Sequence, residues 1–282
     1  MTNQLSYPRN ATAVPRRIRR VLIRKAPPRL RGLVCGTLTM CRLYAVARSE
    51  QDRFAREHAG WRLLARVAAH ICPSYVVTDY AKLWFEDDDF LVQYRRLVPG
   101  NDRSADRKYF LRSLLQLADR LPGDTAECGV YEGATSWFIC DHFRGSGKAH
   151  HAFDSFEGLP EPTHLDGRYW QPGNLKTVED RARATLTGFE VNFYPGWIPE
   201  RFAEVMNRQF CFVHIDVDLY QPTRDSLEFF YPRTVAGGII ICDDYGFATC
   251  PGATSAMEEF MADRPEPIVR CPTGQAFIVK AS

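Results

Sequence analysis

The segment GDTAECGVYEGATSWF, residues 123–138, contains a short apolar run, a turn with two glycines and the start of an amphipathic stretch. The apolar run predicts a buried strand, and the residues after the glycines predict a helix. A strand that passes through a tight turn into a helix is the building unit of parallel, doubly wound sheets. Pro122 and Gly123 end the helical pattern that precedes this segment, so we expect the sheet to begin here.

The same alternation continues to the C-terminus and predicts a parallel sheet covered by helices on both faces. The last two strands are separated only by CPTG, residues 271–274, so we expect them to pair as an antiparallel hairpin. The expected strands lie near 124–129, 150–154, 190–194, 210–216, 236–242, 267–270 and 275–280. The expected helices between them lie near 133–144, 177–187, 199–208, 221–231 and 252–263.

Charge and apolar spacing divide the chain into three expected regions: a basic tail over 1–31, a helical N-terminal or cap region over 32–121, and a sheet domain over 122–282. The tail has nine Lys and Arg residues and no acid, so its charge is +9. Because the net charge of the whole chain is +2, residues 32–282 sum to −7 and are mildly acidic. Such an arm can contact anionic lipid, although a solvated tail is the simpler alternative.

Composition indicates a globular protein, because 45% of the residues are hydrophobic and 25% are charged. The nine cysteines are odd in number and contain no Cys-x-x-Cys pair, which argues against a disulfide framework or a zinc site. We therefore expect a protein of a reducing, cytoplasmic compartment. We also expect a homo-oligomer that binds no nucleic acid.

Ligands of open parallel sheets bind beyond the carboxyl ends of the strands, where the strand order reverses. The first strand ends in ECGVYEG, residues 127–133. Its glycines allow a ligand to approach the backbone, and the following helix N-terminus favours a carboxylate or phosphate. Glu127 could accept hydrogen bonds from an ammonium group, so an amino-acid moiety fits this turn. An ordinary strand-to-helix connection is the alternative.

The second strand ends at Asp154, where a carboxylate can accept hydrogen bonds from both hydroxyls of a ribose. Alternatively, Asp154 beside Ser155 caps a helix. The glycine spacing does not match a dinucleotide site. Trp197, after the third strand, could offer an aromatic surface to an adenine ring or could simply pack.

Four carboxylates follow two central strands. FVHIDVDLY, residues 212–220, places Asp216 and Asp218 at one strand end, and IIICDDYG, residues 239–246, places Asp243 and Asp244 at another. Four converging acids without basic partners repel one another, and Mg²⁺ is the natural counter-charge. The alternative is solvated loop acids or helix caps. His214 fits a hydrogen-bonded core histidine better than a base.

At these residues the sequence resembles the macrocin O-methyltransferase family of metal-dependent sugar methyltransferases. The resemblance implies a class I methyltransferase fold, which is a Rossmann-like α/β doubly wound sheet, here with a C-terminal antiparallel hairpin and an N-terminal helical extension. The matching blocks are LWFEDDDF (83–90), GDTAECGVYEGATS (123–136), FDSFEGLPEP (153–162), YPGWIPE (194–200), HIDVDLYQPTRDSLEFFYPR (214–233) and GGIIICDDYG (237–246).

The resemblance also implies S-adenosylmethionine as the methyl donor and Mg²⁺ as the metal that holds a sugar diol. Asp216, Asp243 and Asp244 would bind the metal, and Asp218 or Asp216 would take the proton. Val217 departs from the family pattern, which has glycine there. The residues that would bind the donor are Glu127, Gly129, Val130, Tyr131, Gly133, Asp154, Ser155 and Trp197.

The expected function is Mg²⁺-dependent O-methylation of a hydroxyl of a sugar diol in a glycoside or saccharide. A catechol acceptor is one alternative, since it also presents two adjacent oxygens to a metal. A protein that keeps the fold but has lost catalysis, attached to a membrane through its basic arm, is another. A nicotinamide-dependent dehydrogenase is disfavoured by the glycine turn and leaves the acids unexplained.

Overall fold

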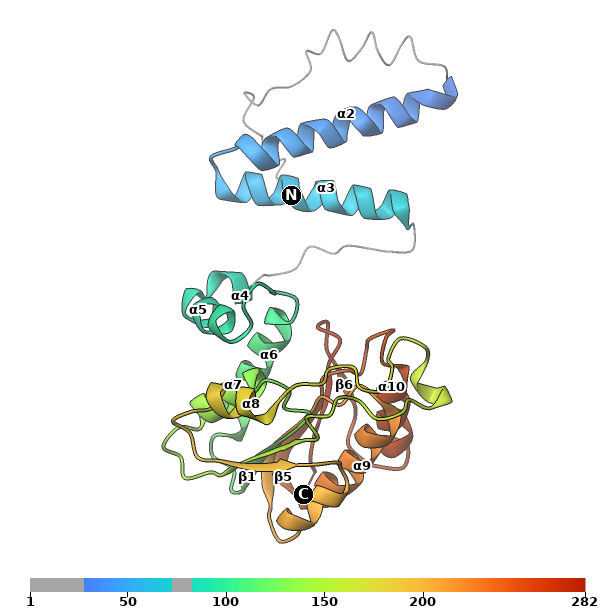
Figure 1. The fold of residues 1–282 in the computed structure, drawn as a ribbon. Helices are drawn as coiled ribbons and strands as arrows, with labels where there is room; N and C mark the ends of the chain where they lie inside the picture. The colour runs from blue at the N-terminus through green and yellow to red at the C-terminus, as the bar shows by residue number, and fades with distance from the viewer. Residues whose placement is uncertain (1–27, 73–82, 282) are drawn as a thin grey trace. The chain divides into compact units, whose positions relative to one another are not determined.

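The computed structural model describes residues 28–72 and 83–281, and it divides the chain into two compact units, Met1–Ala81 and Lys82–Ser282 (Figure 1). All but the last four residues of the expected basic tail, 1–31, lie outside the described residues. Each unit is described by itself below.

The first unit contains two helices that pack against each other, α2 (Pro28–Ser49) and α3 (Arg53–Ile71). Asp52 begins α3 by accepting a hydrogen bond from the backbone N–H of Ala55 at 2.6 Å. The apolar spacing along α3 predicts a buried face, but Leu64 and Ile71 are 58% and 78% exposed. Over the described residues, no helix combines the length and apolar character needed to span a membrane.

The second unit is built on one seven-stranded sheet with the order β3-β2-β1-β4-β5-β7-β6. The five strands β1 to β5 are parallel, whereas β7 runs antiparallel to both β5 and β6, so the expected C-terminal hairpin is confirmed. The strand order reverses at β1, which lies between β2 and β4. The strands are β1 (Asp124–Cys128), β2 (His150–Asp154), β3 (Val191–Pro195), β4 (Phe210–Ile215), β5 (Thr234–Cys242), β6 (Val269–Arg270) and β7 (Ala276–Val279).

Helices cover both faces of this sheet (Figure 1). One face packs against α9, α10 and the 3₁₀ helix η3, and the other against α5, α6 and α7. The expected helix near 199–208 is instead the six-residue 3₁₀ helix η3, which lies between Pro199 and the turn at Met206. The helices are α4 (Leu83–Glu86), α5 (Asp88–Leu97), α6 (Ala105–Leu115), η1 (Gln116–Ala118), α7 (Ala134–His142), η2 (His164–Asp166), α8 (Glu179–Thr185), η3 (Glu200–Val205), α9 (Tyr220–Phe230), η4 (Tyr231–Arg233) and α10 (Pro251–Met261).

The boundary between the compact units differs from the boundary expected at residue 121. Phe90 of α5 and Leu111 of α6 are fully buried in the same apolar cluster as Phe212 and Ile241 of the sheet. These helices therefore cover one face of the sheet rather than forming a separate cap. This packing brings α6 beside the carboxyl ends of the central strands.

Candidate active site

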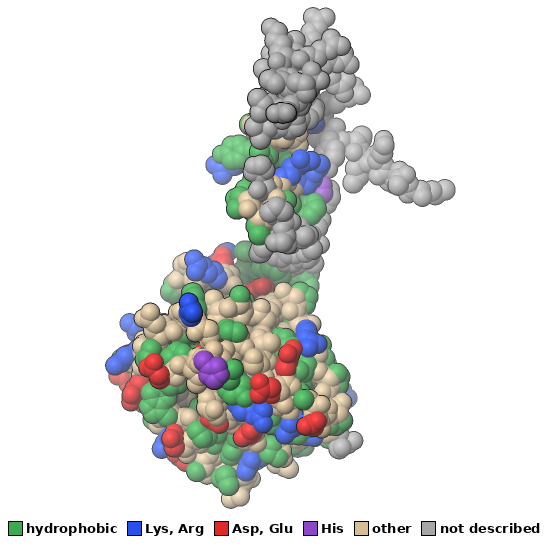
Figure 2. All heavy atoms as spheres, turned by 90° about the vertical axis from the view of Figure 1, so that its right-hand side faces the viewer, with side chains coloured by type: hydrophobic (Ala, Val, Ile, Leu, Met, Phe, Trp, Pro, Cys, Tyr) green, Lys and Arg blue, Asp and Glu red, His purple; other side chains and the backbone are tan. Residues whose placement is uncertain are grey.

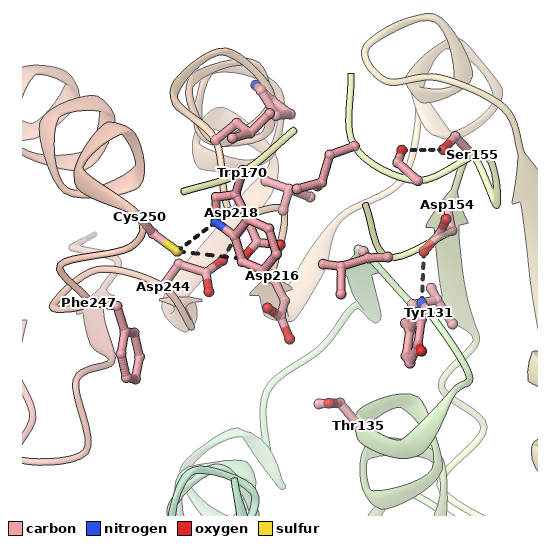
Figure 3. A pocket seen from close by; sticks show the side chains of 18 of the residues that line it. Tyr131, Thr135, Asp154, Ser155, Trp170, Asp216, Asp218, Asp244, Phe247 and Cys250 are labelled. Atoms are coloured by element: carbon pink, nitrogen blue, oxygen red, sulfur yellow. Dashed lines mark hydrogen bonds between the residues drawn. The ribbon is translucent and has the colours of Figure 1, made fainter. Parts of the chain in front are cut away.

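A cavity of about 1300 Å³ lies beyond the carboxyl ends of the parallel strands. Typical small-molecule sites measure roughly 300–1000 Å³, so this cavity has room for two ligands side by side. Figure 3 shows the turn at Tyr131 and Asp154 on one side of the cavity and three of the acids on the other. The wall comes from segments within 97–108, 129–135, 153–175, 196–199, 216–225 and 244–250, together with Thr273.

The glycine turn after β1 brings two strand ends into close contact. Gly129 has a φ of 85°, and a Cβ at this position would lie 1.8 Å from the carbonyl oxygen of Asp216. Only glycine fits such an approach. Gly129, Val130 and Tyr131 line the cavity, as expected of a ligand-binding turn. Gly133 begins α7 and contacts α8 instead of the cavity.

Asp154 fixes this turn from the end of β2. Its Oδ2 accepts a hydrogen bond from the backbone N–H of Tyr131 at 2.7 Å, and its Oδ1 accepts one from Phe156 at 2.6 Å (Figure 3). Burial raises the pKa of Asp154 in spite of these bonds. The carboxylate lines the cavity and has acceptor capacity beyond these bonds for a hydroxyl of a ligand. Ser155 and Trp197 also line the wall, and Trp197 is 37% exposed.

Glu127 is not where the sequence predicted a direct ligand contact. Its side chain is buried and absent from the cavity wall, and its two oxygens accept hydrogen bonds from Ser136 and from Nδ1 of His214, the latter at 3.0 Å. The reason is register, because Glu127 and His214 are direct neighbours on β1 and β4 and their side chains meet on one face of the sheet. The expected contact of Glu127 with an ammonium group is therefore corrected to a role in this buried network.

Asp216, Asp218 and Asp244 meet at the opposite end of the cavity. Asp244 Oδ2 accepts a hydrogen bond from the backbone N–H of Asp218 at 2.9 Å. Cys250 lies within hydrogen-bond distance of Asp218, and Trp170 donates to the Cys250 sulfur at 3.3 Å (Figure 3). Burial and the charge of Asp216 raise the pKa of Asp218 to about 7, and burial with the charge of Asp218 raises the pKa of Asp244 well above its ordinary value.

Asp243 lies behind the cavity wall and is completely buried. Its Oδ1 accepts hydrogen bonds from His214 at 3.2 Å and from Gln275 at 2.6 Å, and its Oδ2 pairs with Arg107. Burial alone would raise the pKa of Asp243, but Lys108, His214 and Arg107 outweigh it and hold the pKa far below its ordinary value. Asp243 and Asp244 lie in the turn that follows β5, and the turn places Asp243 behind the cavity wall and Asp244 in it.

The expectation that these four acids have no basic partners is wrong. Arg107 of α6 contacts Asp243, and the Nζ of Lys108 lies 3.8 Å from Oδ2 of Asp216. Sequence reasoning missed both residues, because they belong to the helical region that was expected to form a separate cap. It also missed Tyr169, Trp170 and Phe247, which line the cavity from loops without regular spacing.

The acids still exceed the bases around this end of the cavity. Asp216, Asp218, Asp243 and Asp244, which we call the acid cluster, together with Glu127 make five carboxylates. Arg107, Lys108 and His214, whose pKa is raised to about 9 by its bonds to Asp243 and Glu127 against the effect of burial, supply three positive charges. If all eight groups are ionised, two negative charges are left over, which equals the charge of one divalent cation. Without such a cation, burial and the mutual repulsion of the acids raise the pKa values of Asp216, Asp218 and Asp244.

The donor atoms also suit such an ion. Carboxylate oxygens of Asp216 and Asp243 lie within 4.8 Å of each other, as do those of Asp218 and Asp244. Carboxylate oxygens that face a polar cavity are the ligands that Mg²⁺ prefers. On the face of the second unit seen in Figure 2, acidic and basic side chains are interspersed. The residues present therefore fit a hard divalent cation.

Comparison with known proteins identifies the family. The model of the macrocin O-methyltransferase (TylF) family matches residues 100–271, which is more than half of the chain. The chain belongs to the macrocin O-methyltransferase family. The matched residues include the glycine turn, Asp154, the acid cluster, and both Arg107 and Lys108.

Two relatives show how much of the chain is similar to known methyltransferases. The 8-demethyl-8-(2,3-dimethoxy-alpha-L-rhamnosyl)-tetracenomycin-C 4'-O-methyltransferase of Streptomyces olivaceus is 33% identical over 152 residues, which are 49% of this chain and 58% of the relative. The mycinamicin III 3''-O-methyltransferase of Micromonospora griseorubida is 32% identical over 155 residues, or 48% of this chain and 59% of the relative. The chain thus spans less than two thirds of the length of either relative.

Solved structures support the fold of this macrocin O-methyltransferase family member. The O-methyltransferase NovP matches with a TM-score of 0.52 at 23% identity, over 63% of this chain and 81% of that chain. The calicheamicin methyltransferase CalS11 matches with a TM-score of 0.53 at 18% identity, over 74% of this chain and 100% of that chain. The expected class I methyltransferase fold, with its antiparallel C-terminal strands, is confirmed.

Proposed function

We propose that this protein transfers a methyl group from S-adenosylmethionine to a hydroxyl of a sugar diol in a glycoside or saccharide, with Mg²⁺ bound at the acid cluster. The observation that carries the proposal is that one cavity of about 1300 Å³ contains both a nucleoside-type turn and a group of carboxylates with excess negative charge. The two relatives named above are methyltransferases whose names specify sites on glycosylated antibiotics, which supports the acceptor class.

The side of the cavity formed by the glycine turn and Asp154 supports binding of the donor. The carboxylate of Asp154 has free lone pairs for the ribose hydroxyls, and the close passage of Gly129 lets the backbone approach the amino-acid part. Tyr131 and Trp197 offer aromatic surface along the same wall. S-adenosylmethionine supplies an activated methyl group on a positively charged sulfur.

The acid cluster supports binding of Mg²⁺ and of the acceptor. Asp216 and Asp244 face the cavity, and Asp243 lies directly behind them. The cation supplies Lewis-acid activation that lowers the pKa of a coordinated hydroxyl. Holding the two reactants in line within one cavity lowers the activation barrier further, since orientation can contribute up to about 7–11 kcal/mol.

Asp218 is the proposed general base. Its side chain lines the cavity beside Asp216 and Asp244, next to the place that an acceptor hydroxyl held by the cation would occupy. The acceptor hydroxyl passes its proton to a carboxylate oxygen of Asp218 and its oxygen forms a bond to the methyl carbon. The carbon–sulfur bond breaks with its electron pair remaining on sulfur, so the products are a methyl ether, a neutral thioether and protonated Asp218.

The proposal is tested by mass spectrometry on a panel of rhamnosides, other glycosides and catechols incubated with the protein and S-adenosylmethionine. We expect a gain of one methylene unit on a glycoside, lost when EDTA is added and restored by Mg²⁺. Methylation of catechols but of no glycoside would show that the acceptor is a catechol and not a sugar diol. Failure to bind S-adenosylhomocysteine or Mg²⁺ in calorimetry would favour a protein that has lost catalysis.

The remaining proposals concern the surroundings of the protein. The proposal of a reducing, cytoplasmic compartment rests on the sequence, in which the nine cysteines are odd in number and contain no Cys-x-x-Cys pair. Contact of the basic arm with anionic membranes rests on sequence charge alone, since most of 1–31 lies outside the described residues. Vesicle flotation with and without these residues tests it, and equal flotation would refute it.

A further inference from the structure

Arg107 occupies one of the two carboxylate oxygens of Asp243. Asp243 Oδ1 already accepts hydrogen bonds from His214 and Gln275, so Oδ2 is the oxygen with room for a further partner. The guanidinium of Arg107 is paired with this oxygen. Asp216 lies close by, with ligand atoms of Asp216 and Asp243 within 4.8 Å of each other.

We infer that Arg107 sets the affinity of the cation site by exchange: its guanidinium holds Asp243 in the metal-free protein and must leave Oδ2 when a divalent cation binds. The inference rests on the proposed function, because it concerns the cation site that the proposed reaction needs. It gives Arg107 of α6 a role in cation binding, although Arg107 belongs neither to the glycine turn nor to the acid cluster.

Electrostatics favours exchange over simultaneous binding. A cation that ligates Oδ2 would lie within a few ångströms of the guanidinium in a buried environment, where like charges repel strongly. Asp243 is completely buried, so water screens this repulsion little. The metal-free protein needs Arg107 for the opposite reason, because an uncompensated buried carboxylate is costly.

The surroundings of Arg107 allow it to move. Its side chain keeps 22% of its surface exposed and lines the cavity, whereas the side chain of Lys108 is only 9% exposed. The guanidinium carbon lies 5.0 Å from the centre of the Phe247 ring, which also faces the cavity. Arg107 can therefore turn away from Asp243 into the cavity and keep a favourable cation–π contact.

A purely positioning role makes the opposite prediction. If Arg107 only orients the Asp243 carboxylate for the metal, its removal weakens cation binding. If Arg107 competes with the metal, its removal strengthens cation binding. The sign of the change in Mg²⁺ affinity therefore separates the two roles, and no acceptor is needed to measure it.

The experiment is calorimetric titration of Mg²⁺ into the metal-free full chain, for the wild type, Arg107→Met, Arg107→Lys and Arg112→Met. Arg112 lies on the same helix and pairs with Asp87 at 3.3 Å outside the cavity wall, so its removal is a matched loss of charge. We expect binding at least about 10-fold tighter for Arg107→Met, an intermediate change for Arg107→Lys, and no change for Arg112→Met. Unchanged or weaker binding by Arg107→Met overturns the inference.

Thermal unfolding gives a second readout that also covers a poorly folding variant. We expect EDTA to lower the melting temperature of Arg107→Met more than that of the wild type, because the variant then lacks both the cation and Arg107, and only Lys108 and His214 remain to balance the charge of Asp243. An equal effect of EDTA on the two proteins contradicts the inference, and Arg107→Lys serves for this comparison if Arg107→Met does not fold. Absence of Mg²⁺ binding in all proteins, wild type included, overturns the proposed cation site itself and the inference with it.

Discussion

Replacing Asp218 by Asn is expected to stabilise the metal-free protein while removing its proposed base. Asp218 is 7% exposed, and its pKa is raised from 3.8 to about 7, first by burial and then by the charge of Asp216. A raised carboxyl pKa means that the folded state binds the proton more tightly than the unfolded state. The ionised carboxylate thus destabilises the fold, and asparagine keeps the shape of the side chain without its charge.

The size of the effect follows from the shift. A change from 3.8 to about 7 corresponds to about 4 kcal/mol once Asp218 is fully ionised in both states. Because the neighbouring acids redistribute their protons, we expect a gain of about 2–4 kcal/mol above neutral pH, or roughly 4–16 °C in melting temperature for a domain of this size. The contribution of Asp218 to stability is greatest below about pH 4 and falls as the pH rises to about 7, so the gain of the variant grows over this range.

The assay is urea unfolding of the wild type and Asp218→Asn in EDTA at several pH values. Asp263→Asn, the same change at an exposed acid, is the control and should alter the free energy of unfolding by less than about 0.5 kcal/mol. Addition of Mg²⁺ should stabilise the wild type more than the variant. A variant that is no more stable at pH 8, or whose gain is the same at pH 4, would refute the electrostatic reasoning.

Three other substitutions test separate parts of the site and fold. Asp154→Ala should weaken binding of S-adenosylhomocysteine by about 100-fold, because two charge-assisted hydrogen bonds are lost, and calorimetry showing a change below threefold would exclude the ribose role. Gly129→Ala should cost more than about 3 kcal/mol or prevent folding, since its Cβ would lie 1.8 Å from a carbonyl oxygen; a soluble variant with an unchanged melting temperature would contradict this. Glu266→Gln should lower the free energy of unfolding by about 2 kcal/mol at neutral pH. Burial alone would raise the pKa of Glu266, but hydrogen bonds from Tyr231 and from the backbone N–H of Ala281 outweigh it and lower that pKa from 4.5 to about 2. This contribution exists above pH 4.5 and disappears as the pH falls toward 2, so a stability difference that persists in acid would show that the carboxylate charge is not its source.

Much of the fold was predictable because it depends on local patterns. Apolar runs at residues 210–215 and 239–242 indicate buried strands without knowledge of their partners, and the CPTG turn leaves no room for a helix before the last strand. The ends of these strands fix where Asp154, Asp216 and Asp244 emerge, since parallel strands present their carboxyl ends at one edge. The sequence alone therefore determined the α/β sheet, its terminal hairpin and the edge on which a site would form.

Only the tertiary structure decided which charges surround the acids. Arg107 and Asp243 are 136 positions apart, and no spacing rule connects a residue of α6 with the end of β5. The same holds for Glu127, which faces His214 rather than a ligand because β1 pairs with β4 in one particular register. Local sequence sets strands, turns and helix faces, whereas the electrostatics of a buried site depends on which distant elements pack against one another, and that is a property of the whole core.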